Sequence, residues 1–392
     1  MFLMMINIIF AKLEKYYHLL NSIKMKFKIL LILAISLAFS ACKTNKKEKA
    51  DVESGETKKW EGGLIFPEEV HFKTLKQITF GGDNAEAYWS FDDQQLIFQS
   101  NNKEWGVACD QMFLMNVDET FKDSIPPMIS TGLGRTTCAY FLPDNKSFVY
   151  GSTHLGGKEC PPAPLRREGK YVWPIYETYD IFVADLEGNI TKQLTTEPGY
   201  DAEATVSPKG DKIVFTSMRT GDLELFTMNI DGTDVKQITD QLGYDGGAFF
   251  SPDGTKLIFR SSRPKTAVAI KEYQDLLKEG LVQPTEMELY ICNADGSDLR
   301  QLTDLGNANW SPFFHPSGKK ILFSSNFESE RGFPFNLYMI DLDGKNLERV
   351  THGETFDAFP VFSNDGKKLI FSSNRNNGGG HDTNLFIAEW QD

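Results

Sequence analysis

One nine-residue pattern recurs along the chain and constrains the fold more than any other feature. Its clearest copies are S-P-K-G-D-K-I-V-F at Ser207–Phe215, S-P-D-G-T-K-L-I-F at Ser251–Phe259 and S-N-D-G-K-K-L-I-F at Ser363–Phe371. Less regular copies begin at Ser90, Leu142 and His315. Each copy is typical of a β-hairpin, because its glycine tolerates the positive φ of a tight turn between two apolar runs. Six such units, each with three or four short strands, predict an all-β fold, a six-bladed β-propeller.

The two ends of the repeat array predict how the propeller closes. The last unit has the strand Asn384–Trp390 as its third strand, whereas the strand-like run Leu75–Thr79 precedes the first unit without belonging to it. We expect this N-terminal strand to complete the last blade, because that pairing removes an exposed sheet edge. The predicted propeller domain therefore spans residues 71–392.

Residues 1–70 have the features of an export signal and a tether. Met25, an alternative start of the chain, begins a basic segment that is followed by the apolar run Ile29–Phe39. This run is too short for the roughly 20 residues of a membrane span. The sequence F-S-A-C then resembles a lipoprotein processing site, which predicts lipidation of Cys42; an ordinary cleaved signal is the alternative. We expect a signal region at 1–41, a lipidated cysteine with a polar, flexible tether at 42–70, and a location in the periplasm or at the outer membrane.

The charge of the chain disfavours one class of partner. The formal net charge is −13 at pH 7, whereas nucleic-acid binding requires basic patches. An acidic surface suits a soluble domain, which we expect to be a monomer, and it tolerates protein partners or cations. We therefore expect no nucleic-acid partner, and membrane contact only through the lipid.

The longest insertions are predicted on one face of the propeller. They follow the second strand of their units and span residues 101–110, 153–179, 264–286, 327–334 and 376–383. Loops on a rigid scaffold commonly carry function, so this elaborated face is the predicted binding face. Within the fourth unit, Thr266–Glu279 has the apolar spacing of an amphipathic helix, which could be a lid, a docking element or a packed decoration.

Three of the remaining cysteines are predicted to share this face. Cys109 and Cys160 lie in insertions and Cys138 begins a strand beside them. Because exported proteins commonly form disulfides, one pair among the three is expected, either Cys109–Cys138 or Cys138–Cys160. Cys292 lies within an apolar strand and is expected to be a buried free thiol.

A polar residue stands six positions before each repeat anchor, where the first strand of each unit begins. These residues are predicted to surround the mouth of the central channel and to bind a ligand, a partner or a divalent cation; they are Asn84, Thr136, Asp201, Asp245, Asn309 and Asp357. The alternative is that they stabilise their own turns.

Other polar residues on the predicted binding face carry weaker signals. His154, His352 and His381 are weak candidates for a transition-metal site, because they lie in separate loops without ligand-like spacing. The recurrent S-x-R arginines, Arg219, Arg263 and Arg375, are expected to form structural pairs between blades.

The order S-P-D-G-x-K-[IL]-x-F, then L-[YF]-x-M-[ND]-x-D-G, then Q-[IL]-T resembles the propeller repeats of the TolB-like family. The resemblance covers residues from about 71 to 392 and implies a six-bladed platform that docks a protein over its channel. Related propellers also occur in peptidases and oligogalacturonate lyases. No G-x-S-x-G nucleophile motif is present, so a peptidase is not expected. We therefore expect an envelope protein-docking scaffold first, a glycan or small-ligand binder second and a metal-dependent polysaccharide lyase third.

Overall fold

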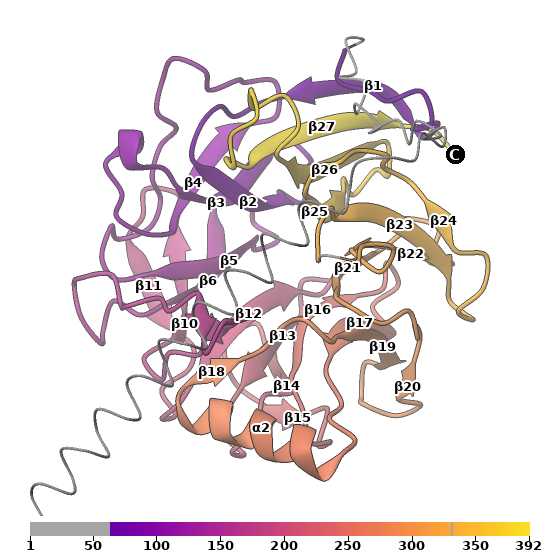
Figure 1. The fold of residues 1–392 in the computed structure, drawn as a ribbon. Coiled ribbons are helices and arrows are strands. Elements are labelled where there is room, and N and C mark those ends of the chain that lie inside the picture. The colour runs from indigo at the N-terminus through magenta and orange to yellow at the C-terminus, as the bar shows by residue number, and fades with distance from the viewer. Residues whose placement is uncertain (1–62, 331) are drawn as a thin grey trace, which may run out of the picture. The chain divides into compact units, whose positions relative to one another are not determined.

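The computed structural model describes residues 63–330 and 332–392, which form six antiparallel sheets around a common axis (Figure 1). We number the sheets as blades 1–6 in chain order and call the strands of each blade A to D from the axis outwards. The A strands of neighbouring blades pack against one another around the whole circle. The predicted all-β, six-bladed propeller is thus confirmed. No helix within the described ranges is long and apolar enough to cross a membrane.

The strands of the six blades have the following bounds. Blade 1 holds β2 (Asp83–Trp89), β3 (Gln95–Asn101) and β4 (Gln111–Asn116); blade 2 holds β5 (Thr136–Phe141), β6 (Ser147–Ser152), β10 (Asp180–Asp185) and β11 (Ile190–Gln193). Blade 3 holds β12 (Asp201–Val206), β13 (Lys212–Ser217), β14 (Glu224–Asn229) and β15 (Lys236–Gln237); blade 4 holds β16 (Asp245–Phe250), β17 (Lys256–Ser261), β19 (Glu288–Asn293) and β20 (Arg300–Gln301). Blade 5 holds β21 (Asn309–Phe314), β22 (Lys320–Ser325), β23 (Asn336–Asp341) and β24 (Glu348–Arg349); blade 6 holds β25 (Asp357–Phe362), β26 (Lys368–Ser373), β27 (Asn384–Trp390) and β1 (Phe72–Gln77).

Blade 6 combines both ends of the repeat array, as predicted. Strand β1 pairs antiparallel with β27, with Leu75 opposite Ala388 and Gln77 opposite Phe386. Figure 1 shows the two strands side by side, β1 in indigo and β27 in yellow. The N-terminal strand therefore covers the edge that β27 would otherwise expose.

Contacts with the propeller begin before residue 71, within the segment that the sequence analysis placed in the tether. Glu69 is buried, and its carboxylate accepts hydrogen bonds from both terminal nitrogens of Arg375 at 3.0 and 3.1 Å. Arg375 also donates to the carbonyl of Leu64 at 3.0 Å. Residues 64–70 are therefore fastened to blade 6. The predicted signal region, Cys42 and most of the tether lie outside the described residues.

The recurrent pattern is a device for closing the A–B hairpin. In blade 4 the Ser251 hydroxyl donates to the Asp253 carboxylate at 2.6 Å and accepts from the backbone N–H of Lys256 at 2.9 Å, while Gly254 takes a φ of 73°. The same serine–aspartate bond closes blades 1 and 6. The aromatic residue that ends the pattern is fully buried in every blade, and these six residues are Phe98, Tyr150, Phe215, Phe259, Phe323 and Phe371. One pattern thus supplies both the turn and a large apolar side chain for the core.

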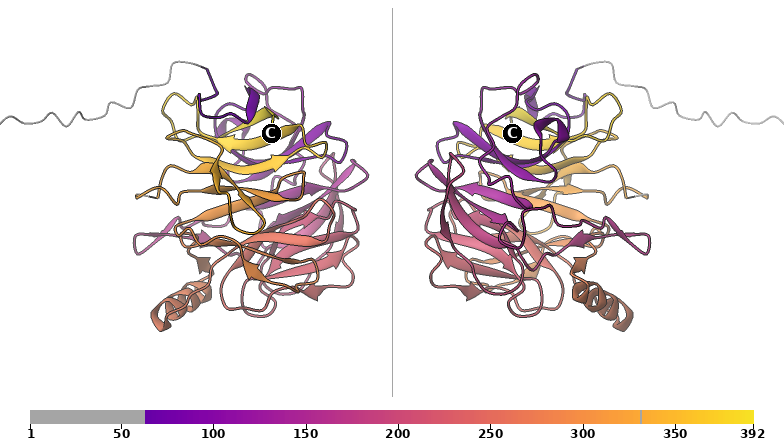
Figure 2. Two further views of the ribbon diagram at one scale, coloured as in Figure 1. Left: turned by 90° about the vertical axis from the view of Figure 1, so that its right-hand side faces the viewer. Right: turned by 90° about the vertical axis from the view of Figure 1, so that its left-hand side faces the viewer.

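The insertions of blades 2 and 4 join into one structure on the elaborated face. The blade 2 insertion contains β7 (Arg166–Arg167), β8 (Lys170–Tyr171) and β9 (Trp173–Pro174), the blade 4 insertion contains α2 (Ala267–Lys278) and β18 (Leu281–Val282), and a short 3₁₀ helix, η1 (Lys103–Trp105), lies in the blade 1 insertion. Strand β9 pairs with β18. The predicted helix is confirmed, with Thr266 capping its first turn, and Figure 2 shows it projecting from the blades.

Candidate functional site

The six polar residues predicted to line the channel mouth are structural. All six are at most 1% exposed, and each lies opposite a serine at the end of strand B. The pairs in register are Asn84–Ser100, Thr136–Ser152, Asp201–Ser217, Asp245–Ser261, Asn309–Ser325 and Asp357–Ser373. The prediction that these side chains offer a ligand or cation site at the mouth is therefore not supported by their geometry, because their polar atoms are turned to partners within the protein. We call the six residues that begin the A strands the strand-start ring; they are Asn84, Thr136, Asp201, Asp245, Asn309 and Asp357.

The strand-start ring also explains the S-x-R arginines. In the three blades where the ring residue is aspartate, the arginine two positions after the paired serine reaches it. The nitrogen–oxygen distances are 3.0 Å for Arg219–Asp201, 2.7 Å for Arg263–Asp245 and 2.9 Å for Arg375–Asp357. Where the ring residue is Asn or Thr, that arginine is replaced by Asn102, His154 or Phe327. The arginines are structural, as expected, but they pair within a blade and not between blades.

A second ring lies four positions before each repeat anchor, and the sequence analysis did not identify it. Every A strand has a break in register there, and the residue at the break has a left-handed φ between 47° and 60°. A β-bulge of this kind interrupts the regular alternation of side chains along the strand and changes the direction of the side chain at the bulge. The six residues, which we call the bulge ring, are Glu86, Cys138, Glu203, Gly247, Ser311 and Phe359.

The bulge ring encloses a cavity of about 50 Å³ on the propeller axis, which we call the channel cavity. All six ring residues line it, together with Tyr88, Thr137, Thr205, Phe249, Arg260, Pro360 and Val361. The cavity is thus built from all six blades, and its wall combines two carboxyl groups, one guanidinium, one thiol and several aromatic rings. Because five residue types occupy six equivalent positions, the chemistry of the cavity is asymmetric although the fold is nearly symmetric.

One of the two carboxyl groups has a complete set of partners. The Glu203 carboxylate accepts from Arg260 at 2.5 Å, from the Tyr244 hydroxyl at 2.6 Å and from the backbone N–H of Gly247 at 2.8 Å. A Cβ atom on Gly247 would lie only 2.0 Å from a terminal nitrogen of Arg260, so only glycine leaves room for this guanidinium. Burial raises the pKa of Tyr244 well above its ordinary value, so its hydroxyl remains a proton donor. The charges of Glu203 and Arg260 therefore neutralise each other.

The other carboxyl group, on Glu86, accepts a hydrogen bond from the thiol of Cys138 at 2.9 Å and from no other donor in the part of the chain that the structure describes. Burial raises the pKa of Glu86 to about 7, with the thiol and the more distant Arg260 opposing part of that shift. Burial likewise raises the pKa of Cys138 well above its ordinary value, so the thiol keeps its proton at neutral pH. Glu86 is thus a carboxyl group that faces the channel cavity, and no cation among residues 63–330 and 332–392 forms an ion pair with it.

A second cavity, of about 160 Å³, lies at the opposite end of the axis, on the face of the A–B hairpins. We call it the hairpin-face cavity. Residues of all six blades line it, and they are Trp89, Phe91, Tyr140, Val206, Pro208, Phe249, Phe250, Pro252, Phe313, Phe314, Pro316, Phe362, Ser363 and Asn364. Most of these are aromatic residues or prolines at positions next to the repeat anchors. The long insertions predict binding on the elaborated face, whereas this apolar cavity is on the other face.

The elaborated face carries aromatic packing over the channel. The ring of Trp173, from the blade 2 insertion, lies 5.2 Å from the Arg260 guanidinium and 5.2 Å from the ring of Trp310. Trp310 in turn stacks on Phe335 at 4.6 Å. Trp173 of the blade 2 insertion, backed by Trp310 and Phe335 of blade 5, therefore packs against the Arg260 side of the channel cavity.

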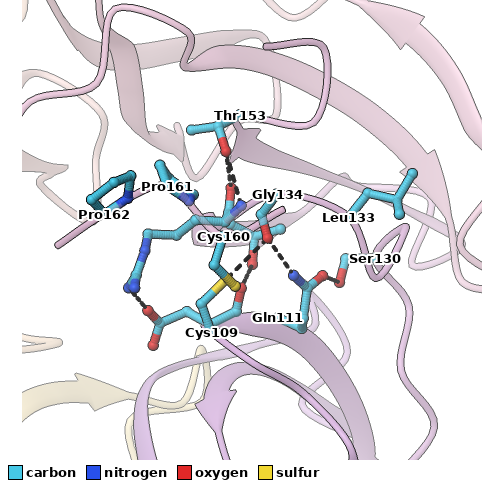
Figure 3. The surroundings of a disulfide bond; sticks show 12 residues. Cys109, Gln111, Ser130, Leu133, Gly134, Thr153, Cys160, Pro161 and Pro162 are labelled. Carbon is cyan, nitrogen blue, oxygen red and sulfur yellow. Dashed lines mark hydrogen bonds and ion pairs between the residues drawn. A yellow bond between two sulfur atoms is a disulfide. The ribbon is translucent and has the colours of Figure 1, made fainter. Parts of the chain in front are cut away.

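The disulfide differs from both predicted pairings. Cys109 bonds to Cys160, with the Cα atoms 6.0 Å apart, and Cys138 is free. Figure 3 shows the Cys109 sulfur and the Gln111 amide directed at the Gly134 carbonyl, each at 3.0 Å. Both predicted pairs included Cys138, which the bulge of β5 turns into the channel cavity and away from the insertions. Cys292 is a buried free thiol, as expected.

The three candidate metal-binding histidines do not form a site. His154 contacts the Ser152 hydroxyl at 2.9 Å and lies against the ring of Phe182, and burial lowers its pKa. His352 contacts the carbonyl of Arg349, and His381 is exposed. Within residues 63–330 and 332–392, no group of three or more His, Cys, Asp or Glu residues could hold a metal ion.

Comparison with known proteins supports the repeat class. The family model described as the TolB beta propeller domain matches residues 175–280, which include all of blade 3 and the inner strands of blade 4. No curated protein matches the chain. The match shows TolB-type propeller sequence over residues 175–280, and the six sheets show the β-propeller fold.

Solved structures with similar folds include three bacterial proteins. The putative TolB from Agrobacterium tumefaciens has 19% identity and a TM-score of 0.49, with 79% of this chain and 91% of that chain covered. TolB from Acinetobacter baumannii has 17% identity and a TM-score of 0.47, with 79% and 65% covered. An oligogalacturonate lyase from Vibrio parahaemolyticus has 12% identity and a TM-score of 0.47, with 80% and 93% covered.

Proposed function

We propose that this TolB-like propeller is a protein-docking scaffold of the cell envelope that receives an apolar segment of its partner in the hairpin-face cavity. The observation that carries the proposal is the cavity itself, about 160 Å³ on the axis and lined largely by aromatic residues and prolines. Aromatic side chains supply much of the binding energy at protein interfaces, because they bury a large area at low entropic cost. A rigid propeller holds such side chains in place before the partner arrives.

The hairpin-face cavity suits an inserted segment better than a flat contact. Its lining comes from every blade, so a single apolar side chain or turn of the partner would touch several blades at once. The surrounding hairpin turns carry charged residues such as Asp253 and Asp365, whose pKa values are lowered by hydrogen bonds from their own turns. A polar rim around an apolar centre is the usual arrangement of a protein interface.

The envelope location in this proposal rests on the N-terminal segment. The apolar run before Cys42 and the F-S-A-C sequence favour export and lipidation. A lipid on Cys42 would keep the propeller near a membrane through a polar tether. Replacing Cys42 with serine should then release the protein from the membrane fraction, and unchanged partitioning into detergent would contradict lipid anchoring.

Site-specific photo-crosslinking in living cells tests the docking face. A crosslinking residue is placed at Lys209, in the blade 3 hairpin beside the cavity, or at Val268 on α2, where the side chain is 77% exposed on the elaborated face. We expect one defined envelope protein to be captured from position 209 and not from position 268. The capture should be lost when Phe250, which lines the cavity, is changed to Asp in a protein that retains its thermal unfolding transition.

Two results would redirect the proposal. Capture from position 268 that is indifferent to Phe250→Asp would assign docking to the elaborated face. The aromatic lining also suits stacking against sugar rings, so a glycan-binding function is the second candidate. Failure of both positions to capture a protein, together with thermal stabilisation by an oligosaccharide that Phe250→Asp abolishes, would favour that candidate.

A further inference from the structure

The channel cavity holds an imbalance of charge that the docking proposal does not use. With Glu86 ionised, the cavity wall carries two carboxylates against one guanidinium, because Arg260 is already engaged by Glu203 and Tyr244. The remaining ionisable groups on the wall, Tyr88 and Cys138, are neutral at neutral pH, since burial raises the pKa of each. Asp110, at a greater distance, is paired with Arg135. When Glu86 is ionised, the cavity therefore has one uncompensated negative charge.

The shape and the rest of the wall indicate what would compensate that charge. The cavity of about 50 Å³ has room for roughly three to five water-sized groups, given that one water needs about 10–15 Å³. Tyr88, Phe249 and Phe359 offer aromatic rings, and aromatic faces attract organic cations. Thr137 and Ser311 add hydroxyl groups that can accept hydrogen bonds.

A hard metal ion fits this wall less well. Divalent cations such as Ca²⁺ take six or more oxygen ligands, and the channel cavity has only one carboxyl group that is not already paired. We infer that the channel cavity is a binding site for a small organic cation, a primary ammonium or a guanidinium group, whose charge is balanced by Glu86. The cation is either a free small molecule or the tip of a lysine or arginine side chain.

The site is reachable and is independent of the hairpin-face cavity. Glu86, Thr137 and Cys138 are only partly buried, so the carboxyl side of the cavity is not sealed by protein. The two cavities share Phe249 alone among their lining residues. A failed docking experiment would therefore leave this inference standing, and failure of the cation site would leave the docking proposal standing.

Isothermal titration of the full-length protein with methylammonium or guanidinium chloride tests the site. Tetramethylammonium serves as a control of equal charge that is larger and has no N–H donor. Only the ionised Glu86 balances a cation, so affinity should rise about tenfold between roughly pH 6 and roughly pH 8, centred on its pKa of about 7. Near neutral pH, binding should release a proton, which is measured as a dependence of the heat on the buffer.

Variants test whether the cation binds beside Glu86. Glu86→Gln should abolish both the binding and the proton release, while Glu104→Gln, an exposed glutamate in the same blade, should change neither. Phe359→Gly removes an aromatic wall without altering charge and suits the left-handed φ of 56°, so it should fold and bind several-fold more weakly. Tighter binding of an arginine peptide amide than of free guanidinium would identify a partner's side chain as the source, and the reverse would identify a free cation.

Three outcomes would overturn the inference. These are no binding of either probe to the wild-type protein at roughly pH 8, equal binding by the Glu86→Gln variant, and equal binding of tetramethylammonium.

Discussion

The strand-start ring and the bulge ring lie two residues apart on the same six strands, yet they differ in what they leave free. The strand-start ring is polar in every blade. Five of its side chains interact with the serine opposite them, three of these also with an arginine of the same blade, and Thr136 donates to the carbonyl of Asp110. The bulge ring contains acidic, thiol, hydroxyl, aromatic and glycine positions, and it surrounds a cavity. Uniform chemistry at a repeated position therefore indicates architecture here, whereas unequal chemistry marks the place where the propeller can recognise something.

This difference has a physical cause. Each blade must begin its inner strand at the same point and satisfy the same buried polar groups. All six positions of the strand-start ring therefore require a polar side chain. The bulge ring is constrained in backbone conformation, since all six residues have a positive φ, but its side chains face open space on the axis. Side chains there are free to differ from blade to blade.

The largest expected effect is a loss of stability when the strand-start ring is altered, with no change in cation binding at the bulge ring. Arg263→Met should lower the free energy of unfolding by about 3–5 kcal/mol, because it leaves the fully buried Asp245 without its cation. Chemical denaturation measures this loss. Cation binding in the channel cavity should be unchanged once the variant is folded.

A double variant provides the matched control for that loss. Changing Asp245 to Asn as well as Arg263 to Met imitates blade 5, where Asn309 stands without an arginine. The double variant should recover most of the lost stability. If the single variant is as stable as the wild type, the strand-start ring is not the structural network described above.

The next effect concerns Glu86 and pH. Its pKa is about 7 in the folded protein against an ordinary value of 4.5, so the folded state holds its proton more tightly than the unfolded state. Stability from this group is present in full below about pH 4.5 and is lost as the pH rises to about 7. The loss should reach up to about 3 kcal/mol, at about 1.4 kcal/mol per pKa unit.

Glu86→Gln should remove that part of the pH dependence, as measured by denaturation at a series of pH values. Burial also raises the pKa of Glu224, to about 8, and that of several aspartates including Asp201 and Asp245, so only the difference between variants isolates the contribution of Glu86. A wild-type curve that stays parallel to that of Glu86→Gln from acid to neutral pH would contradict the shifted pKa.

The smallest effect compares, within blade 5, Ser311 of the bulge ring with Ser325, the serine that lies opposite Asn309 of the strand-start ring. Ser311→Gly should raise the melting temperature modestly, with a gain of up to about 1 kcal/mol, because serine is strained at a φ of 49° whereas glycine is not. Ser325→Gly should lower stability by about 1 kcal/mol, because it removes the 2.7 Å hydrogen bond to Asn309. Equal signs for the two substitutions would remove the distinction between the rings.

Much of the fold could be predicted from the sequence because the repeats carry local chemistry. The hairpin glycines, the serine at each anchor and the terminal aromatic residue such as Phe259 specify the A–B unit within nine residues. The pairing of the N-terminal strand with Asn384–Trp390 was also predictable, because only that strand lacked a blade. The helix after Thr266 followed from its capping residue and apolar spacing.

The candidate site was predicted less well, for reasons visible in particular residues. Asp201, Asp245 and Asp357 were expected at an open mouth because their partners, the arginines, lie 18 residues later and appear as a separate motif. Cys138 was assigned to a disulfide because its position in sequence, beside two insertions, does not reveal the bulge that directs it to the channel. Glu86 has no local signature, because nothing near it in sequence shows that it is not paired with a cation.

The sequence alone determined the number of blades, the hairpin turns, the closure by β1 and the buried aromatic core, because each depends on short-range patterns that repeat. The tertiary structure alone decided which polar residues are paired, which cysteines bond and where the two cavities lie. Those properties arise where residues from six separate strands meet on one axis, and such a meeting has no local signature in the chain.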